Sequence, residues 1–264
     1  MFFMGRFLGT LFPVNKLHAG KMIRSLSAKF KDQEACADIA TGVFGTSEWR
    51  IDSEGTLHIG EGVFAKSSAQ SPWSIHSKVI KKITFESKVK SISDSLSYLF
   101  NSLELVTQIE GLSFLDTTES TDMQYMFSGL RNLVSLDVAS FNTCKVTNMD
   151  NMFFCLSSIE CLDLANFNTS NVTTMRAMFA GMTKLKVLDV TSFDTTKVTN
   201  MVGMFYNLKN LEVLKIANFN INKVITANQM FSGLDSLKYL SLGDFNKWKI
   251  IHKKYNEQGE KINT

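Results

Sequence analysis

The chain has 264 residues, of which 44% are hydrophobic and 20% are charged, so it can bury the core of one or two domains. No apolar run reaches the roughly 18 residues that a transmembrane helix needs, and the sequence predicts no transmembrane segment. The net charge of +3 comes from the two ends: residues 1–31 hold six basic residues and no acid, and residues 247–264 hold five lysines and two glutamates. The body between them is therefore net acidic, which argues against nucleic-acid binding, because phosphate contacts need a positive face.

Residues 1–46 form a basic N-terminal segment. Arg6 is followed by a short apolar stretch, residues 7–14, and by a small residue at Ala19, an outline that loosely follows a secretory signal peptide. Leu17, however, lies where signal cleavage prefers a small side chain. Three interpretations stay open: a signal, a disordered arm, or a misassigned start.

Residues 47–95 predict a small β-rich N-terminal cap. The segment from Trp49 to Ile59 contains two alternating stretches around a glycine, which is typical of a hairpin, and further strands are predicted at 80–85 and 89–92. The first unit of a repeat array exposes its core and its strand edge unless something covers them. We expect Trp49 and Trp73 to cover the first repeat.

Residues 96–246 form an array of 26-residue repeats, of which the first is degenerate. Three independent ladders share this period, which indicates a solenoid of stacked units. The ladders are Met126-Phe127, Met152-Phe153, Met178-Phe179, Met204-Phe205 and Met230-Phe231; Leu136, Leu162, Leu188, Leu214 and Leu240; and Phe141, Phe167, Phe193, Phe219 and Phe245. Phe114 precedes Phe141 by 27 residues, so the phase slips by one at the start of the array. A single unit cannot bury its apolar side, so we expect the ladders to form the core of the stack.

Each unit predicts a short strand followed by a short helix. Leu214 and Ile216 alternate as in a strand, and the threonines at 147, 173 and 199 occupy helix N-cap positions. Two residues after each Met-Phe pair stands a glycine, an asparagine or Cys155, a position typical of the left-handed residue that ends a helix; we expect Cys155 to be slightly strained. The predicted fold class is α/β: a leucine-rich-repeat-like solenoid with a parallel β-sheet on one face and short helices on the other, after the small β-rich cap. Residues 247–264, with Trp248, predict a C-terminal cap and tail.

The unit from Leu162 to Met182 closely resembles the 26-residue repeats of the BspA-like leucine-rich-repeat surface proteins. The segment from Trp49 to Gly60, followed by Ser71-Pro72-Trp73, is similar to the region that precedes their arrays, and the resemblance covers about residues 47–246. It implies a cell-surface or secreted protein, and some members of that family act as adhesins for host matrix, mucus or other cells. The sequence shows no Leu-Pro-x-Thr-Gly sorting signal, hydrophobic C-terminal anchor or clear lipoprotein cysteine, so we expect a short or truncated relative.

The candidate ligand-binding face lies on the solvent side of the predicted strands. The inward residues belong to the apolar ladder, so their neighbours point outward and align in rows from turn to turn. One row is Asp137, Asp163, Asp189 and Lys215, and the adjoining row is Cys161, Val187, Val213 and Tyr239. A half-exposed apolar row beside acidic residues predicts a contact patch, and an ordinary solvated sheet face is the alternative.

The sequence predicts no catalytic residue, cofactor or metal site. It has no phosphate loop, GxSxG or HExxH motif, and the four cysteines form no CxxC pair and no zinc-ligand spacing. The predicted function is a non-catalytic binding module, a cell-surface or secreted adhesin whose partner is a protein, mucus component or glycan on a host or neighbouring cell. The alternative is an intracellular protein-interaction scaffold.

Overall fold

The structure is a computed structural model that describes residues 37–66, 70–92 and 96–243. The chain divides into two compact units, Met1–Ala37 and Asp38–Thr264, and the second contains every strand within the described ranges. The signal-like sequence within residues 1–36, the predicted C-terminal cap with Trp248, and Phe245 at the end of its ladder lie outside the described residues.

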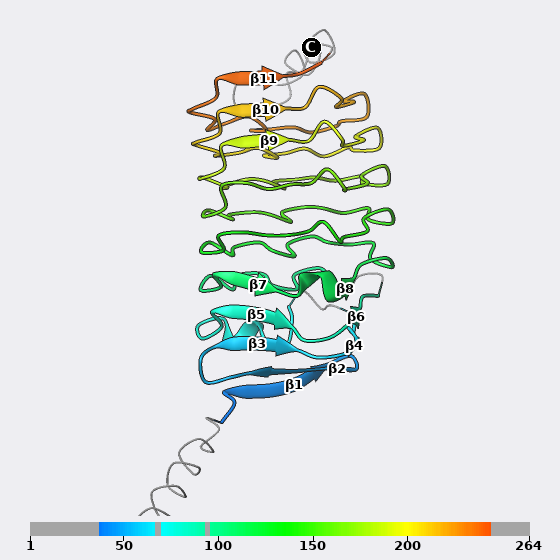
Figure 1. Cartoon of the computed structure of the whole chain (residues 1–264). Coiled ribbons are helices and arrows are strands. Elements are labelled where there is room, and N and C mark those ends of the chain that lie inside the picture. The colour runs from blue at the N-terminus through cyan, green and yellow to red at the C-terminus, as the bar shows by residue number, and fades with distance from the viewer. Residues whose placement is uncertain (1–36, 67–69, 93–95, 244–264) are drawn as a thin grey trace, which may run out of the picture. The chain divides into compact units, whose positions relative to one another are not determined.

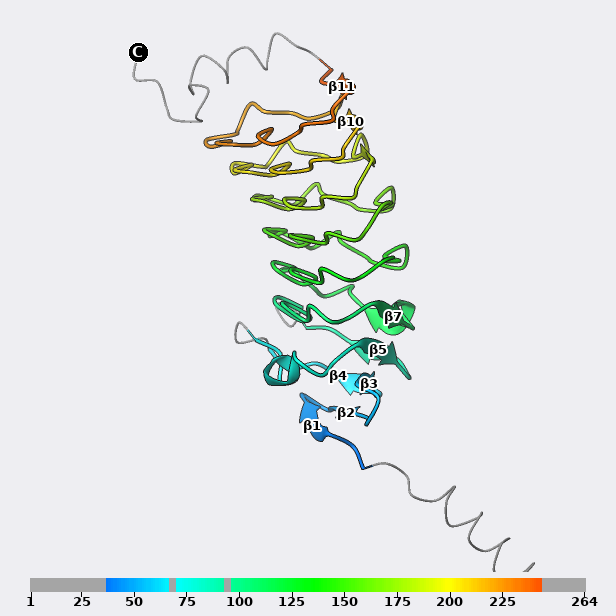
Figure 2. The same ribbon diagram turned by 90° about the vertical axis from the view of Figure 1, so that its left-hand side faces the viewer.

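The second unit is a parallel-strand β-solenoid of about seven turns, which confirms the predicted leucine-rich-repeat-like solenoid (Figures 1 and 2). Successive turns lie on one another, so residues about 26 apart in sequence are neighbours in space. Its elements in chain order are β1 (Ala40–Phe44), β2 (Ser47–Ile51), β3 (Thr56–Ile59), β4 (Gly62–Val63), η1 (Ser74–His76), β5 (Lys82–Phe85), β6 (Val89–Lys90), β7 (Gln108–Glu110), η2 (Leu112–Phe114), β8 (Leu115–Asp116), β9 (Val187–Asp189), β10 (Val213–Lys215) and β11 (Tyr239–Ser241).

The strands form three sheets among the described residues. The largest has the order β1-β2-β3-β5-β7, in which the first two pairings are antiparallel and the last two parallel. Strands β9, β10 and β11 form a parallel sheet, and β4, β6 and β8 form another. The chain thus starts with a hairpin-like meander and then stacks one parallel strand on the next, because each later turn returns to the same side (Figure 1).

Two buried tryptophans close the N-terminal end of the stack. Trp73 stacks on Phe100 with ring centroids 6.1 Å apart, and its indole Nε1 donates a hydrogen bond to the Leu99 carbonyl oxygen over 2.9 Å. Trp49 meets Trp73 edge-on at 6.1 Å. Trp73 thus covers the first repeat as the sequence predicted, whereas Trp49 packs on Trp73 and not on the repeat itself. The meander includes β1, which lies within the basic N-terminal segment defined from the sequence.

A continuous stack of phenylalanine rings forms the centre of the core. One ring from each turn lies 5.8–6.1 Å from the next along Phe100, Phe127, Phe153, Phe179, Phe205 and Phe231. The Met ladder and Leu162, Leu188 and Leu214 are buried around it, and Leu136 packs against the core, so these members form the core as predicted. Leu240, in the last described turn, is 37% exposed and does not. Phe114 differs from the other in-phase phenylalanines, because it ends η2 and is 41% exposed, while Leu112 and Leu115 beside it are buried.

The helical part of the predicted fold class is matched only loosely. Within the described ranges the helical elements are the short 3₁₀ turns η1 and η2, and neither lies in the regular repeats. Where a helix was expected after Thr147, alternate backbone N–H groups donate to the next turn instead: Met149 to the Thr174 carbonyl (3.1 Å) and Phe153 to the Met178 carbonyl (3.0 Å). Asn151 and Cys155 are left-handed, a conformation that interrupts a right-handed helix. The repeat therefore forms a tight turn bonded to its neighbours rather than a helix bonded to itself.

The expected N-cap threonines have a different role. The hydroxyl of Thr173 donates to the Thr147 carbonyl over 3.1 Å, and the hydroxyl of Thr199 donates to the Thr173 carbonyl over 3.2 Å. These side chains link turns instead of capping helices. The left-handed position after each Met-Phe pair is confirmed, with φ between 58° and 78°, at Gly129, Cys155, Gly181, Asn207 and Gly233.

Candidate functional site

The sheet of β9, β10 and β11 brings the C-terminal members of both predicted rows together. Val213 lies opposite Val187 on one side and Tyr239 on the other, and Lys215 lies opposite Asp189 and Ser241. Leu188 and Leu214 between them are buried, so the row residues of β9 and β10 point away from the core. Val213 and Lys215 are half-buried there, and Leu240 in β11 is 37% exposed. Val187 is 49% exposed and Tyr239 is 55% exposed.

The N-terminal members of the rows lie in turns that have the same repeat phase but no assigned strand. Asp137, Cys161 and Asp163 are all exposed. The two turns are held together by the Asn166 side-chain amide, whose Nδ2 lies 3.0–3.2 Å from the carbonyl oxygens of Val138, Ala139 and Phe141 in the preceding turn. Side-chain hydrogen bonds thus hold these turns in the same phase, where no backbone strand pairing is assigned, and the two rows continue through them.

Each aspartate of the row also shapes its own turn. One carboxylate oxygen accepts the backbone N–H two residues later, at 3.0 Å for Asp137, 3.0 Å for Asp163 and 3.1 Å for Asp189. Such Asx turns are a local reason for an aspartate at the end of a strand. The second oxygen is left for contacts outside the turn.

Asp189 uses this second oxygen for an ion pair. Its Oδ2 lies 3.0 Å from Nζ of Lys215. The hydrogen bonds from the Thr191 side chain and from Lys215 hold the pKa of Asp189 below its ordinary value. Within the described chain, no such ion pair is found for Asp137 or Asp163.

Glu110 extends the acidic row and was missed from the sequence. It lies in register with Thr84 and precedes Asp137 by 27 residues, across the phase slip at the start of the array. Its carboxylate pairs with Lys82 at 2.7 Å. Only an alignment that allowed for the extra residue would have placed it in the row.

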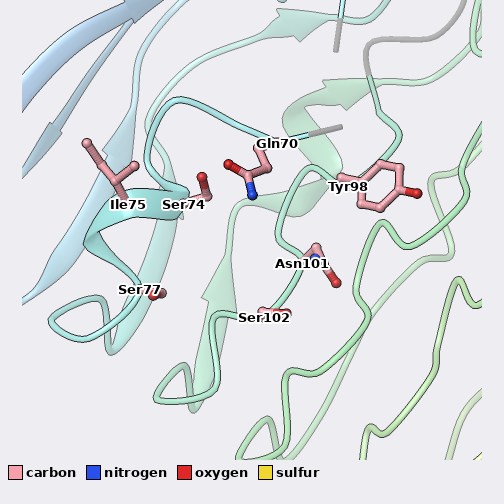
Figure 3. Close-up of a pocket in the computed structure, with 7 residues that line it drawn as sticks. All are labelled: Gln70, Ser74, Ile75, Ser77, Tyr98, Asn101 and Ser102. Atoms are coloured by element: carbon pink, nitrogen blue, oxygen red, sulfur yellow. The ribbon is translucent and has the colours of Figure 1, made fainter. Parts of the chain in front are cut away.

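A polar hollow of about 330 Å³ lies elsewhere, where η1 meets the first turn of the array (Figure 3). It is lined by Gln70, Ser74, Ile75, Ser77, Tyr98, Asn101 and Ser102. The Tyr98 ring stacks on Tyr125 at 4.7 Å, and the lining carries no charged side chain. Sequence reasoning had no signal for this hollow, because its two segments are separate along the chain and neither carries a motif.

The described residues contain no group of three or more His, Cys, Asp or Glu side chains placed to hold a metal ion. Cys144, Cys155 and Cys161 are free thiols. Burial raises the pKa of the Cys155 thiol, and its nearness to Arg131 opposes this only in part. In the part of the chain that is described, no helix has the length and apolarity to cross a membrane.

These features define a leucine-rich-repeat-like solenoid, a class of scaffold whose stacked turns present an extended surface to partners. The chain belongs to the family described as "Mycoplasma protein of unknown function, DUF285", whose model matches residues 94–187 and 177–258. This membership and the solenoid confirm the resemblance to the BspA-like leucine-rich-repeat proteins. No curated protein matches the chain. Among solved structures, a leucine-rich repeat protein from Eubacterium ventriosum is similar, with 15% identity and a TM-score of 0.25 over 78% of this chain and 85% of that chain.

Proposed function

We propose that the protein is a non-catalytic binding module of the cell surface or the extracellular space, which holds a protein, mucus or glycan partner on the solvent face of its strands. The observation that carries the proposal is the row of Val187, Val213 and Tyr239, whose residues lie in register on one face, with the half-buried Val213 between the exposed Val187 and Tyr239. An aligned, solvent-facing apolar row beside charged residues is typical of an interaction surface. The surface location rests on the family resemblance.

The stacking of the turns makes this face suited to binding without rearrangement. Backbone bonds join each turn to the next, and ion pairs such as Glu212 with Lys238 (2.9 Å) border the rows. A partner therefore meets a backbone that is already fixed by bonds between turns, which lowers the entropic cost of association.

Binding of the full chain to immobilised mucin, matrix proteins and a glycan array tests the proposal. Val213→Asp places a charge in the centre of the apolar row, and Tyr239→Ala removes its largest side chain. We expect each to weaken binding by about tenfold or more. Ile225→Ala is the matched control, because Ile225 is 70% exposed but lies outside the rows. Equal losses for the control and the row variants would contradict a site on this face.

The intracellular scaffold is the second candidate, and location separates the two. Intact source cells are treated with protease, and the protein is followed by immunoblot beside a cytosolic marker. Loss of the protein while the marker survives supports the surface module. Protection of both until lysis overturns the adhesin proposal and favours the scaffold.

A further inference from the structure

We infer that the partner of the strand face is a polypeptide segment in which basic residues are followed by aliphatic or aromatic residues, lying across the strands. This inference rests on the proposed function, since it names the chemistry of the ligand for the same face. Two adjacent rows of opposite character carry it, one acidic and one apolar.

The acidic row runs over four consecutive turns through Glu110, Asp137, Asp163 and Asp189. Turns that repeat like paired strands are about 4.8 Å apart, so the row is roughly 14 Å long. Only its ends are neutralised within the described chain, by Lys82 at Glu110 (2.7 Å) and by Lys215 at Asp189 (3.0 Å). Asp137 and Asp163 lie on neighbouring turns between these pairs, and their like charges repel as they would on paired strands. A positive group on the ligand would relieve that repulsion.

Lysine and arginine side chains suit this position better than a metal ion. Asp137 and Asp163 each use one oxygen for their own turn, which leaves one oxygen per residue on an open face. A divalent cation such as Ca²⁺ needs six to eight oxygen ligands around it, and one row on a flat sheet does not enclose it. An ammonium or guanidinium group needs only one or two acceptors from the protein.

The apolar row selects the rest of the ligand. Val187 and Asp189 are two residues apart on β9, so the apolar row runs beside the C-terminal end of the acidic row and then continues to Tyr239. Nucleic acids and anionic membranes would be repelled by the carboxylates, and neutral glycans have no charge to offer them. A polypeptide supplies both kinds of side chain in one segment, with its basic part over Asp137 and Asp163 and its apolar part over Val213 and Tyr239.

The row on the other side of the acids leaves room for such a segment. Its members are small: Ala139, Ala165, Thr191, Ala217 and Gly243. Small side chains let the backbone of a partner approach the sheet closely. The basic side chains of the ligand can then reach the carboxylates from that side.

Fluorescence anisotropy of labelled synthetic peptides on the full chain tests the inference. One twelve-residue peptide carries a block of lysines followed by Val, Leu and Tyr; the second has glutamates in place of the lysines; the third has serines in place of the apolar residues. We expect the first peptide to bind at least about tenfold more tightly than either of the others. Its affinity should fall as salt is raised, because the carboxylate contacts are exposed.

Paired variants assign the effect to the two rows. Asp137→Asn with Asp163→Asn should weaken binding of the first peptide about tenfold and flatten its salt dependence, and Val187→Ser with Tyr239→Ser should weaken it by a similar factor. The matched control is Asp235→Asn with Ile225→Ser, which removes an exposed acid and an exposed apolar residue outside the rows and should change affinity less than about twofold. Circular dichroism and thermal melts establish that every variant is folded.

Equal affinity for the lysine and glutamate peptides, or unchanged binding by the asparagine pair, overturns the inference. The proposed function is judged separately, from the mucin, matrix and glycan assays with Val213→Asp. If those partners still depend on Val213 while the peptides show no preference for lysine, the face binds but its partner is not basic. If neither set depends on the face, the proposed function fails as well.

Discussion

Buried threonine hydroxyls fasten each turn to the next at the level of single residues. The Thr143 hydroxyl accepts the backbone N–H of Asn168 over 2.8 Å and donates to the carbonyl of the same residue over 3.0 Å. Both main-chain groups of a residue in the next turn are thus satisfied by one side chain. The same contact to the following carbonyl recurs at Thr117, Thr143, Thr169 and Thr195.

Thr143→Val should therefore destabilise the protein although the two side chains have nearly the same shape. The change leaves the N–H and the carbonyl of Asn168 without their partner at a side chain that is 1% exposed. We expect a loss of about 1–3 kcal/mol in the free energy of unfolding, measured by urea denaturation. Thr143→Ser keeps the hydroxyl and should lose clearly less. A valine variant as stable as the serine variant would contradict the role of the hydroxyl.

Gly181 and Cys155 provide a second test, because they meet across neighbouring turns. A Cβ added to Gly181 would lie 2.8 Å from the Cys155 sulfur, and the φ of +76° at Gly181 is itself unfavourable for a side chain. Gly181→Ala should cost about 1–3 kcal/mol of stability in the natural sequence. In a Cys155→Gly background the steric part disappears, so the same substitution should cost less. Thermal melts of the natural protein, the two single variants and the double variant give the interaction energy between the two positions. If Gly181→Ala costs the same in both backgrounds, the strain at its φ alone is responsible.

The left-handed residues show what single positions reveal in the sequence. The position that holds Gly129 and Gly181 was predictable, because glycine or asparagine recurs there. A second left-handed position was missed; it is occupied by Tyr125, Asn151, Ala177, Gly203 and Gln229. These side chains share no property, because the backbone bonds to the next turn set the conformation, and those bonds leave no mark on residue type.

At the scale of the element, a phenylalanine's contribution to stability depends on whether its ring lies in the buried stack. Phe179 is fully buried between Phe153 (5.8 Å) and Phe205 (5.9 Å), whereas Phe114 is 41% exposed. Phe179→Ala should cost about 3–5 kcal/mol, because it removes a large side chain and leaves a cavity. Phe114→Ala should cost less than about 1 kcal/mol, as a surface change does. Urea denaturation measures both, and equal costs would show that Phe114 is buried like the others.

Isolated β-bridges join successive turns from Asp122 through Asn148, Thr174 and Asn200 to Thr226. Asp122 is the titratable residue among them, so it makes the stability of the protein depend on pH. It pairs with Asn148 in the next turn, and its Oδ1 accepts the backbone N–H of Gln124 over 2.8 Å. Burial raises the pKa of Asp122 more than its hydrogen bonds with Gln124 and Asn148 lower it. Folding therefore disfavours the ionised form of Asp122. At a pH below the pKa that Asp122 has in the unfolded chain, the group does not affect stability. As the pH rises through its higher pKa in the folded protein, the group lowers stability.

Asp122→Asn should accordingly stabilise the protein at pH 7 and lose this advantage as the pH falls below the ordinary aspartate pKa. Asparagine suits the position, since Asn148 makes the equivalent turn by accepting the N–H of Asp150 over 3.0 Å. Melting temperatures of both proteins between about pH 3 and pH 7 measure the difference. A difference that is constant across this range would show that the charge is not its cause.

The loose match of the predicted helices has its cause at the scale of the element. Met149, Met152 and Phe153 have the spacing of a helix face, and all three are buried. The same spacing also serves a tight turn whose N–H groups bond to another turn. A pattern within one segment cannot tell these apart, because the deciding hydrogen-bond acceptors lie about 25 residues away.

Across the whole molecule, the 26-residue period was enough to predict the stack and the rows. Once residues 26 apart are neighbours, the alignment of Val187, Val213 and Tyr239 follows from their spacing. The polar hollow could not be predicted, because it depends on how η1 packs. Glu110 was missed, although the slip of one residue, carried back from Asp137, leads to it. The predictable part of the site is the part that repeats.

Stacking also predicts that a whole turn can be removed. Deleting residues 163–188 joins Leu162 to Asp189 and keeps every ladder in phase, because the removed segment is one period long. Each turn contacts mainly its neighbours, so the shortened chain should fold and unfold cooperatively at a lower temperature. Its urea m-value should fall by roughly one seventh, in proportion to the surface that one turn of about seven buries. Deleting residues 163–186 is the matched control. It removes almost as many residues but displaces all later ladder residues by two positions. If this control melts at the same temperature as the in-phase deletion, the turns do not stack through their ladders.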